Sequence, residues 1–315
     1  MEKNKCLILG GGGFIGSYLV EGLLNKNYDI RIFEYKGFDR INILHLTDKI
    51  EIIEGDFSNI EDLKIAILDV NFIYHLISTT NPITSMNNIL YDINSNLLST
   101  INLLDLCVDN KNIKEFIFLS SGGTVYGIPD TIPIKESHPT NPICSYGIVK
   151  NAIEKYCMLY KRKYNLNCKI FRLSNPYGER QNPYNNQGAI SIFLNKAMLN
   201  NKIVIWGDGN IIRDYIYVKD CIDILVAAIE INTNETIYNI GSGIGTSINQ
   251  ILEIIKKIVN IELNIEYKNS RDFDVPTNIL DINLLKNDFK WEPKISLKDG
   301  INNQYNFLLK NKKCE

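Results

Sequence analysis

The chain has 315 residues, of which 45% are hydrophobic and 22% are charged, and its 34 basic and 36 acidic side chains give a net charge of −2. This composition is typical of a globular protein, long enough for one large domain or two that share an interface, and it excludes a disordered chain. The near balance of charge gives no reason to expect nucleic acid or an anionic membrane surface as a partner.

The seven cysteines are odd in number and scattered, with no metal-ligand spacing and no CxxC pair. They are typical of reduced thiols and predict neither disulfides nor a metal site. A short polar start leaves no room for a signal peptide, and every apolar run is shorter than the about 20 residues that span a bilayer. We therefore expect a cytoplasmic protein.

The first thirty-odd residues carry the clearest pattern. An apolar run over residues 6–9 meets four consecutive glycines, Gly10 to Gly13, and Gly16 follows. Residues 17–24 then repeat their apolar positions at helical spacing, so the order is strand, tight turn and helix. Backbone that lacks a Cβ can approach a pyrophosphate, and the N–H groups that begin a helix favour negative charge. An ordinary glycine-rich turn is the competing interpretation.

A second strand-like run, residues 30–33, ends on Glu34, which lies eighteen residues past Gly16. A dinucleotide-binding fold places there the acid that contacts the adenosine ribose. This carboxylate disfavours the 2′-phosphate of NADP and therefore predicts NAD, although Lys36 and Arg40 lie nearby in the sequence. After the next strand, Asp56 is expected on the adenine side of the cofactor, or alternatively as a turn residue facing solvent.

Strand-like and helical segments alternate up to residue 173. Strands are predicted at 50–54, 71–77, 113–119 and 168–173, and helices at 60–68, 92–110 and 145–164. This alternation predicts an α/β fold with a Rossmann-type doubly wound parallel sheet. His75 lies inside an apolar run and is interpreted as a core residue, whereas Ser78 and Thr80 follow the end of that strand, where ligands bind in such sheets.

The alternation stops after Gly178, where loops rich in Asn, Gly and Pro begin. We therefore predict an NAD-binding domain over 1–178, to which 214–242 returns. Segments 179–213 and 243–315 are predicted to form a smaller C-terminal domain that covers the reactive end of the cofactor and binds the substrate.

Tyr146 and Lys150 are four residues apart at the start of a predicted helix, so both side chains project from one face. A tyrosine with a pKa near 10 is a poor base at neutral pH. A positive charge about 6 Å away is worth about 2.8 kcal/mol at an effective dielectric of about 20, or about two pKa units. With an oxidised nicotinamide adding a second charge, we expect a phenol pKa of about 6 to 8, suited to removing a proton from a sugar hydroxyl.

Several motifs together resemble the extended short-chain dehydrogenase/reductase family, the NAD-dependent sugar-nucleotide epimerases and dehydratases. They are the three glycines Gly10, Gly13 and Gly16, the segment 120–127, the pair Tyr146 and Lys150, and the segments 172–178, 213–220 and 291–293. The resemblance covers essentially the whole chain. It implies tightly held NAD, a nucleotide-sugar substrate and, from helices 92–110 and 145–164, a homodimer.

The resemblance also implies roles for individual residues. Tyr146 is the base, and Lys150 binds the nicotinamide ribose and tunes that base. The residues expected to bind the cofactor are Gly10, Gly13, Phe14, Ile15, Glu34, Asp56, Phe57, Leu76, Ser78, Tyr146 and Lys150. Those expected to bind the substrate are Thr80, Asn175, Arg213 and Arg271.

This chain departs from the family pattern next to the expected base. The family's catalytic hydroxyl stands three residues before the Val of Val-Tyr-Gly, and Gly122 occupies that position. Ser121, Thr124 or a water is expected to supply the hydroxyl. Gly123 and Thr124 stand where a dehydratase carries an Asp-Glu pair, which argues against 4,6-dehydration. In place of the family's Ala-Ala pair after His-Leu, the chain has Ile77 and Ser78.

Three functions remain open at this point. The first is a nucleotide-sugar 4-epimerase of UDP-hexose type that passes through a transient 4-keto sugar and recycles its NAD. The second is an NAD(P)H-dependent reductase of a 4-keto-6-deoxy nucleotide sugar. The third is a nucleotide-sugar-binding protein that has lost catalysis through Gly122.

Overall fold

A computed structural model describes residues 3–184, 187–270 and 275–312. The chain forms two compact units. Unit 1 comprises residues up to Val125, Thr140–Arg172 and Ile222–Tyr238, and unit 2 comprises Tyr126–Pro139, Leu173–Cys221 and the chain from Asn239 onward. The domain limits expected from the sequence, at residue 178 and around 214–242, stay predictions.

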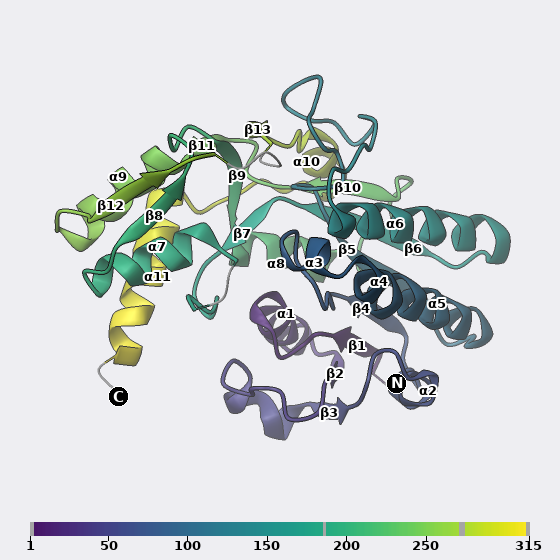
Figure 1. The fold of residues 1–315 in the computed structure, drawn as a ribbon. Coiled ribbons are helices and arrows are strands. Elements are labelled where there is room, and N and C mark those ends of the chain that lie inside the picture. The colour runs from purple at the N-terminus through teal and green to yellow at the C-terminus, as the bar shows by residue number, and fades with distance from the viewer. Residues whose placement is uncertain (1–2, 185–186, 271–274, 313–315) are drawn as a thin grey trace. The chain divides into compact units, whose positions relative to one another are not determined.

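Unit 1 is built on a seven-stranded sheet with the strand order β10-β6-β5-β4-β1-β2-β3 (Figure 1). The strands are β1 (Lys5–Leu9), β2 (Asp29–Glu34), β3 (Glu51–Glu54), β4 (Phe72–His75), β5 (Glu115–Ser121), β6 (Cys168–Leu173) and β10 (Ile237–Ile240), the last of which continues into unit 2. β1 pairs in parallel with both β2 and β4. The predicted doubly wound α/β fold is confirmed.

The composition of β1 explains why it lies at the centre of the sheet. Residues Cys6 to Leu9 are completely buried, as expected for a strand of a parallel sheet that is covered on both faces. The strand order also reverses at β1, since β2 and β3 lie on one side of it and β4 and β5 on the other. Ligands of doubly wound sheets bind beyond the carboxyl ends of the strands at such a reversal.

The helices of unit 1 connect these strands. They are α1 (Phe14–Asn25), the 3-10 helix Leu44–Lys49, α2 (Ile60–Ala66), α3 (Thr84–Asn87), α4 (Ile89–Asp92), α5 (Ser99–Asp109), α6 (Ser145–Tyr164) and α8 (Val218–Ala227), whose first four residues belong to unit 2. α5 and α6 lie side by side (Figure 1). The helix predicted over 92–110 is interrupted, because residues Ile93–Leu98 wind as a π-helix between α4 and α5.

Unit 2 has a core of its own, which includes Tyr177, Leu194, Tyr217 and Ile251. Its strands are β7 (Asn175–Tyr177), β8 (Ile203–Trp206), β9 (Ile212–Tyr217), β11 (Gly245–Ser247), β12 (Ile265–Lys268) and β13 (Thr277–Asn278), and its helices are α7 (Ala189–Met198), α9 (Ile248–Val259), α10 (Asn283–Phe289) and α11 (Leu297–Lys312). β7, β9, β11 and β13 form one small sheet, and β8 pairs with β12.

Across the described ranges, no helix is both long enough and apolar enough to cross a lipid bilayer.

Candidate active site

The glycine turn joins β1 to α1 with almost no side chains. Gly10 has a φ of +90°, in the left-handed region that favours glycine. A Cβ on Gly16 would overlap the carbonyl oxygen of Gly10 and lie 2.7 Å from the Cα of Gly11. Gly13, by contrast, is exposed, and a Cβ there would make only an ordinary contact, 3.4 Å from the carbonyl oxygen of Gly10. The turn is therefore close-packed at Gly16 and accessible to solvent at Gly13, as backbone that binds a pyrophosphate must be.

The first turn of α1 supplies the electrostatics of this glycine turn. Gly13 caps the helix in an extended conformation without a side-chain hydrogen bond, and the first turn holds no acidic residue. The leading N–H groups therefore form an anion-binding helix terminus. Glu34 ends β2 beside it, and its Oε1 accepts a hydrogen bond of 2.6 Å from the N–H of Gly12. Burial raises the pKa of Glu34 to about 7, against the lowering effect of that hydrogen bond.

The other residues expected at the cofactor have different surroundings. Asp56 is exposed, and its Oδ1 accepts hydrogen bonds from the N–H and hydroxyl of Ser58, which lower its pKa. Phe57 lies in the core of unit 1 with its ring 5.1 Å from that of His75. Leu76 and Ser78 follow the carboxyl end of β4, where the Ser78 hydroxyl donates to the carbonyl of Thr80. Phe14 and Ile15, half-buried in the first turn of α1, complete the set.

Tyr146 and Lys150 lie together in the first two turns of α6. The Lys150 ammonium nitrogen is 5.7 Å from the centroid of the Tyr146 ring and 4.8 Å from that of Phe118. It donates a 3.0 Å hydrogen bond to the carbonyl of Leu119 near the carboxyl end of β5. Burial lowers the pKa of Lys150 to about 8, although Asp92 and Glu154 act in the opposite direction.

The residues of the chain raise the pKa of Tyr146 to about 12, because burial of the phenol outweighs the lowering effect of the Ser121 and Ser78 hydroxyls. The expected value of about 6 to 8 included the charge of an oxidised nicotinamide and stays a prediction. The Lys150 ammonium group, 5.7 Å from the ring centroid, does not reverse the effect of burial. The positive charge of an oxidised nicotinamide would act in the same direction as that of Lys150.

The structure distinguishes the two hydroxyls considered as replacements for the one missing at Gly122. Ser121, at the end of β5, interacts with the Tyr146 side chain and favours its ionised form. The Thr124 hydroxyl is buried and makes no hydrogen bond with any described residue. Ser121 is therefore the better placed of the two to act with Tyr146.

The residues expected to bind substrate are found in both units. In unit 1, Thr80 is buried and donates a 2.6 Å hydrogen bond to Asp92, so its hydroxyl serves a structural contact. In unit 2, the amide of Asn175 donates to the carbonyl of Asp214, and Arg213 donates to the carbonyls of Ile212 and Val275. Arg271 lies outside the described residues.

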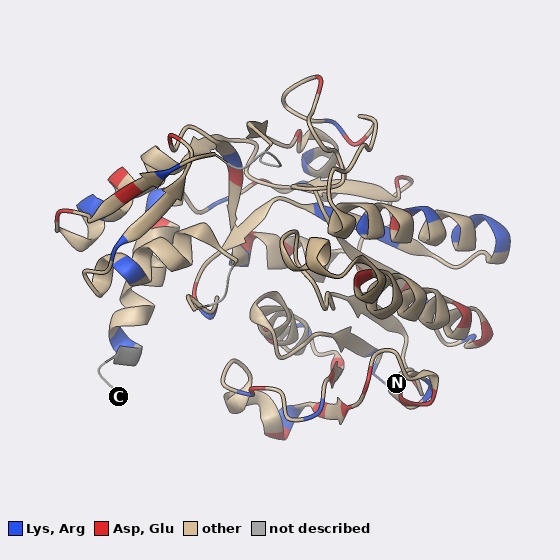
Figure 2. Ribbon diagram, in the orientation of Figure 1, with Lys and Arg blue, Asp and Glu red and all other residues tan. Residues whose placement is uncertain are grey.

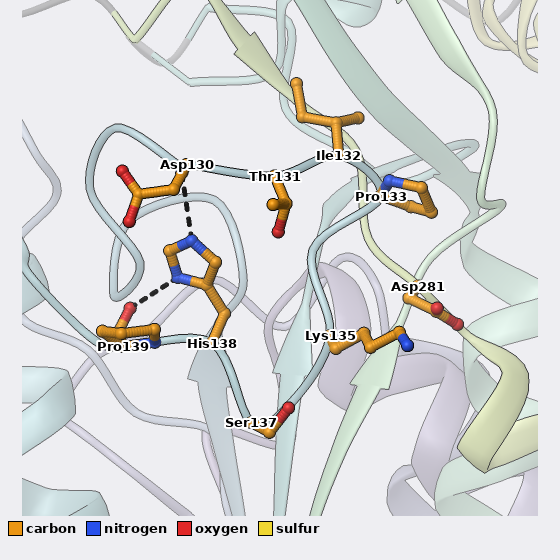
Figure 3. Close-up of a pocket in the computed structure, with 9 residues that line it drawn as sticks. All are labelled: Asp130, Thr131, Ile132, Pro133, Lys135, Ser137, His138, Pro139 and Asp281. Atoms are coloured by element: carbon orange, nitrogen blue, oxygen red, sulfur yellow. Dashed lines mark hydrogen bonds between the residues drawn. The ribbon is translucent and has the colours of Figure 1, made fainter.

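Unit 2 also contains a cavity of about 510 Å³, lined by residues of the 130–139 loop and by Asp281 (Figure 3). In that loop the His138 ring accepts from the N–H of Asp130 and contacts the carbonyl of Pro139 through Nδ1. None of the site residues expected from the sequence lines this cavity.

Two buried carboxylates next to Lys150 were not among the residues expected from the sequence. Glu154 makes a bidentate ion pair with Arg172 and accepts a hydrogen bond from the Ser120 hydroxyl. Asp92 accepts from Thr80, Asn96 and Ser145. Glu154 could have been found from the sequence, because it lies four residues after Lys150 on the same face of the helix. Asp92 could not, because no local sequence pattern identifies its hydrogen-bond partners.

Three features together define the short-chain class of nicotinamide-dependent dehydrogenases. They are a glycine turn where the strand order reverses, an acid at the end of β2 and a Tyr-x-x-x-Lys pair near the end of β5. Comparison with known proteins supports this assignment over the whole chain. A protein of Methanocaldococcus jannaschii provisionally named UDP-glucose 4-epimerase is 38% identical over 306 residues, covering 97% of this chain and 98% of the relative. A dTDP-4-dehydro-6-deoxyglucose reductase of Escherichia coli is 31% identical over 327 aligned residues, covering 100% and 99% of the two chains.

A UDP-glucose 4-epimerase of Thermotoga maritima, solved with UDP-glucose, superposes with a TM-score of 0.92 at 31% identity and covers 98% of this chain and 99% of its own. The sequence profile of the NAD dependent epimerase/dehydratase family matches residues 6–241. The chain belongs to this family, which confirms the resemblance seen in its sequence.

Proposed function

We propose that the protein is an NAD-dependent 4-epimerase of a nucleotide hexose of the UDP type, acting through a transient 4-keto sugar. The observation that carries this proposal is the grouping of Tyr146, Lys150 and Ser121 near the carboxyl end of β5, in the unit that also forms the glycine turn. The names of the relatives from M. jannaschii and T. maritima point to the same reaction.

The residues of unit 1 fit NAD. A close-packed glycine turn leaves backbone N–H groups for the pyrophosphate, and the Glu34 carboxylate lies where NAD presents a ribose hydroxyl and NADP a phosphate. Arg40, which could attract that phosphate, is paired at 2.5 Å with Glu54. Bound there, NAD would supply the hydride acceptor and donor for C4 of the sugar.

Tyr146 moves the proton that accompanies this hydride. As the phenolate it would take the proton of the 4-hydroxyl, and it would give that proton back to the 4-keto oxygen after the sugar has rotated and the hydride has returned to the opposite face of C4. The Ser121 hydroxyl, which interacts with the Tyr146 side chain, donates its one proton to the sugar oxygen during turnover, the role of the hydroxyl that Gly122 lacks. Lys150 keeps the phenolate form accessible through its positive charge. Asn175, Arg213 and Arg271 contact the nucleotide sugar, the arginines through its diphosphate.

The test is interconversion of UDP-glucose and its C4 epimer by the purified protein, with mass spectrometry of the material released on denaturation. We expect retained NAD, turnover without added cofactor, and loss of turnover in Tyr146→Phe. Absence of turnover with several UDP-hexoses, despite retained NAD, would reject the proposal.

A second candidate is reduction of a 4-keto-6-deoxy nucleotide sugar, which the same residues could perform once per bound cofactor. The E. coli relative named as such a reductase favours it. Stoichiometric consumption of added NADH or NADPH with a 4-keto sugar would identify this reaction, whereas an epimerase consumes none. The Asp-Glu pair of a dehydratase is replaced by Gly123 and Thr124, so we do not propose 4,6-dehydration.

We also infer a homodimer. α4 and α6 contact each other, as do α5 and α6 (Figure 1). Large apolar side chains are exposed on these helices and on the π-helix Ile93–Leu98 that joins α4 to α5, namely Leu90, Tyr91, Leu98, Ile148, Tyr156, Met158 and Leu159. The last turn of α6 is basic, through Lys161, Arg162 and Lys163 (Figure 2), so the apolar surface has a charged border. Light scattering should give twice the chain mass, and Leu90→Glu with Ile148→Glu should give the monomer.

We place the protein in the cytoplasm. The described cysteines, including the fully buried Cys6 and Cys157, are all free thiols, and reduced thiols are typical of that compartment.

A further inference from the structure

The N-terminus of α6, which presents Tyr146, is capped by another part of the chain. Its own capping residue, Cys144, has no oxygen in its side chain, and its thiol interacts with the N–H of Gly147 further along the first turn. Instead, the N–H of Ser145 donates to Met86 Sδ at 3.4 Å, and the N–H of Tyr146 donates to Ser85 Oγ at 3.1 Å. Ser85 and Met86 belong to α3, so the position of the catalytic turn depends on a segment about sixty residues earlier.

Asp92 makes the third contact with this turn, and it is completely buried. Its Oδ2 accepts from the Ser145 hydroxyl at 2.6 Å, and its Oδ1 accepts from the Thr80 hydroxyl at 2.6 Å and the Asn96 amide at 3.0 Å. Burying a carboxylate costs free energy unless its oxygens are hydrogen-bonded. All three side-chain partners are neutral donors, so they orient the carboxylate and leave its negative charge to act on its surroundings.

We infer that Asp92 is the positioning residue of the catalytic pair: its buried carboxylate fixes the first turn of α6, which carries Tyr146 and leads into Lys150, through the hydroxyl of Ser145. The inference rests on the proposed function insofar as Tyr146 and Lys150 carry the chemistry. Nothing in the family resemblance assigned Asp92 a role.

The charged and titratable groups around Lys150 give this position of Asp92 a second consequence. Tyr146 and Glu154 lie on α6, Asp92 on α4 and His75 on β4. Glu154 already has a direct cationic partner in Arg172, and burial lowers the pKa of His75 well below its usual value, so that ring is neutral. The carboxylate of Asp92, by contrast, is hydrogen-bonded to the neutral side chains of Thr80, Asn96 and Ser145. It raises the pKa of a lysine whose burial has the opposite effect.

The first experiment measures Lys150 directly in protein without substrate. Lysine is labelled with ¹³C at Cε, the Lys150 resonance is assigned by its loss in Lys150→Arg, and its titration is followed in wild type and Asp92→Asn. We expect the Lys150 pKa to fall by about one unit, the scale of a nearby charge. The control is Asp105→Asn, since Asp105 also accepts a hydrogen bond from α6, through the hydroxyl of Tyr160 at 2.5 Å, but at the far end of the helix. Asp105→Asn should leave the titration unchanged.

The second experiment follows kcat against pH for the epimerisation. In Asp92→Asn the alkaline limb should move to lower pH, and kcat at pH 8 should fall roughly tenfold while KM changes little. Ser145→Ala keeps the charge and removes one contact, so it should lower kcat without moving the limb. Asp92→Glu keeps the charge in a displaced position and should retain most of the Lys150 pKa.

Equal Lys150 titration in wild type and Asp92→Asn, together with unchanged kcat, would overturn the inference. If circular dichroism shows that Asp92→Asn does not fold, the other two variants test the inference. Unchanged kcat in Ser145→Ala would overturn it. A Lys150 pKa lowered by about a unit in Asp92→Glu would also overturn it. An inactive wild type would reject the proposed function alone, because the titration of Lys150 needs no substrate.

Discussion

The glycine turn and the N-terminus of α6 are the two parts of unit 1 that handle ligands, and they are constructed differently. The turn is local, since residues 10–16 and Glu34 create it largely through backbone. The start of α6 is held by side chains from α3 and α4. A backbone cradle tolerates changes in distant side chains, whereas the catalytic turn depends on each of several remote contacts.

The largest expected effect is the loss of turnover when the catalytic phenol of Tyr146 is removed. Tyr146→Phe removes the proton-transferring group while keeping the ring, so turnover should fall by roughly 10² to 10⁴. The glycine turn is untouched, and mass spectrometry should find the same amount of retained NAD as in wild type. Turnover near the wild-type rate would assign the base to another residue.

Next in size is a change in the glycine turn. Gly16→Ala places a Cβ against the carbonyl oxygen of Gly10, and such overpacking should cost about 3 kcal/mol of unfolding free energy and abolish NAD retention. Gly123→Ala is the matched control, because its Cβ would meet only the Ser121 hydroxyl at 4.0 Å. Denaturant unfolding should separate the two variants, and equal stability would contradict the close packing of the turn.

The Glu34 carboxyl group beside the glycine turn makes the free energy of unfolding depend on pH. Its pKa is raised to about 7 in the folded, unloaded protein, so the folded state holds the proton more tightly than the unfolded state. The resulting stability is fully present below about pH 4.5 and is lost as pH rises through 7, by at most about 3 kcal/mol.

Glu34→Gln should remove this dependence, as measured by denaturant unfolding of NAD-free protein between pH 5 and pH 8. Glu61→Gln, which changes an exposed glutamate of α2, should retain it. A wild-type pH dependence in Glu34→Gln would show that another group titrates.

The smallest effect distinguishes the two hydroxyls near Tyr146. Ser121→Ala should lower kcat roughly tenfold and move the acidic limb of its pH profile to higher pH, because a hydrogen bond that favours the phenolate is lost. Thr124→Val should change little, since the Thr124 hydroxyl has no partner among the described residues. The reverse ranking would assign the missing hydroxyl to Thr124.

The sequence alone determined the doubly wound sheet, the glycine turn and the pairing of Tyr146 with Lys150. Each of these is encoded over a few neighbouring residues: apolar runs of strand length, glycines at fixed spacing, and two side chains one helical turn apart. The acid at Glu34 was also predictable, because one helix and one strand follow Gly16 and together fix its distance from the glycine turn.

Only the tertiary structure decided how that pair is tuned and held. Desolvation of Tyr146 raised its pKa, opposite to the effect expected from Lys150 alone, and burial depends on packing by many distant residues. The contacts of Asp92 with Thr80 and Ser145 join segments 12 and 53 residues away. Local patterns record which residues share a strand or a helical face, whereas the field at a buried group is set by whatever the fold brings next to it.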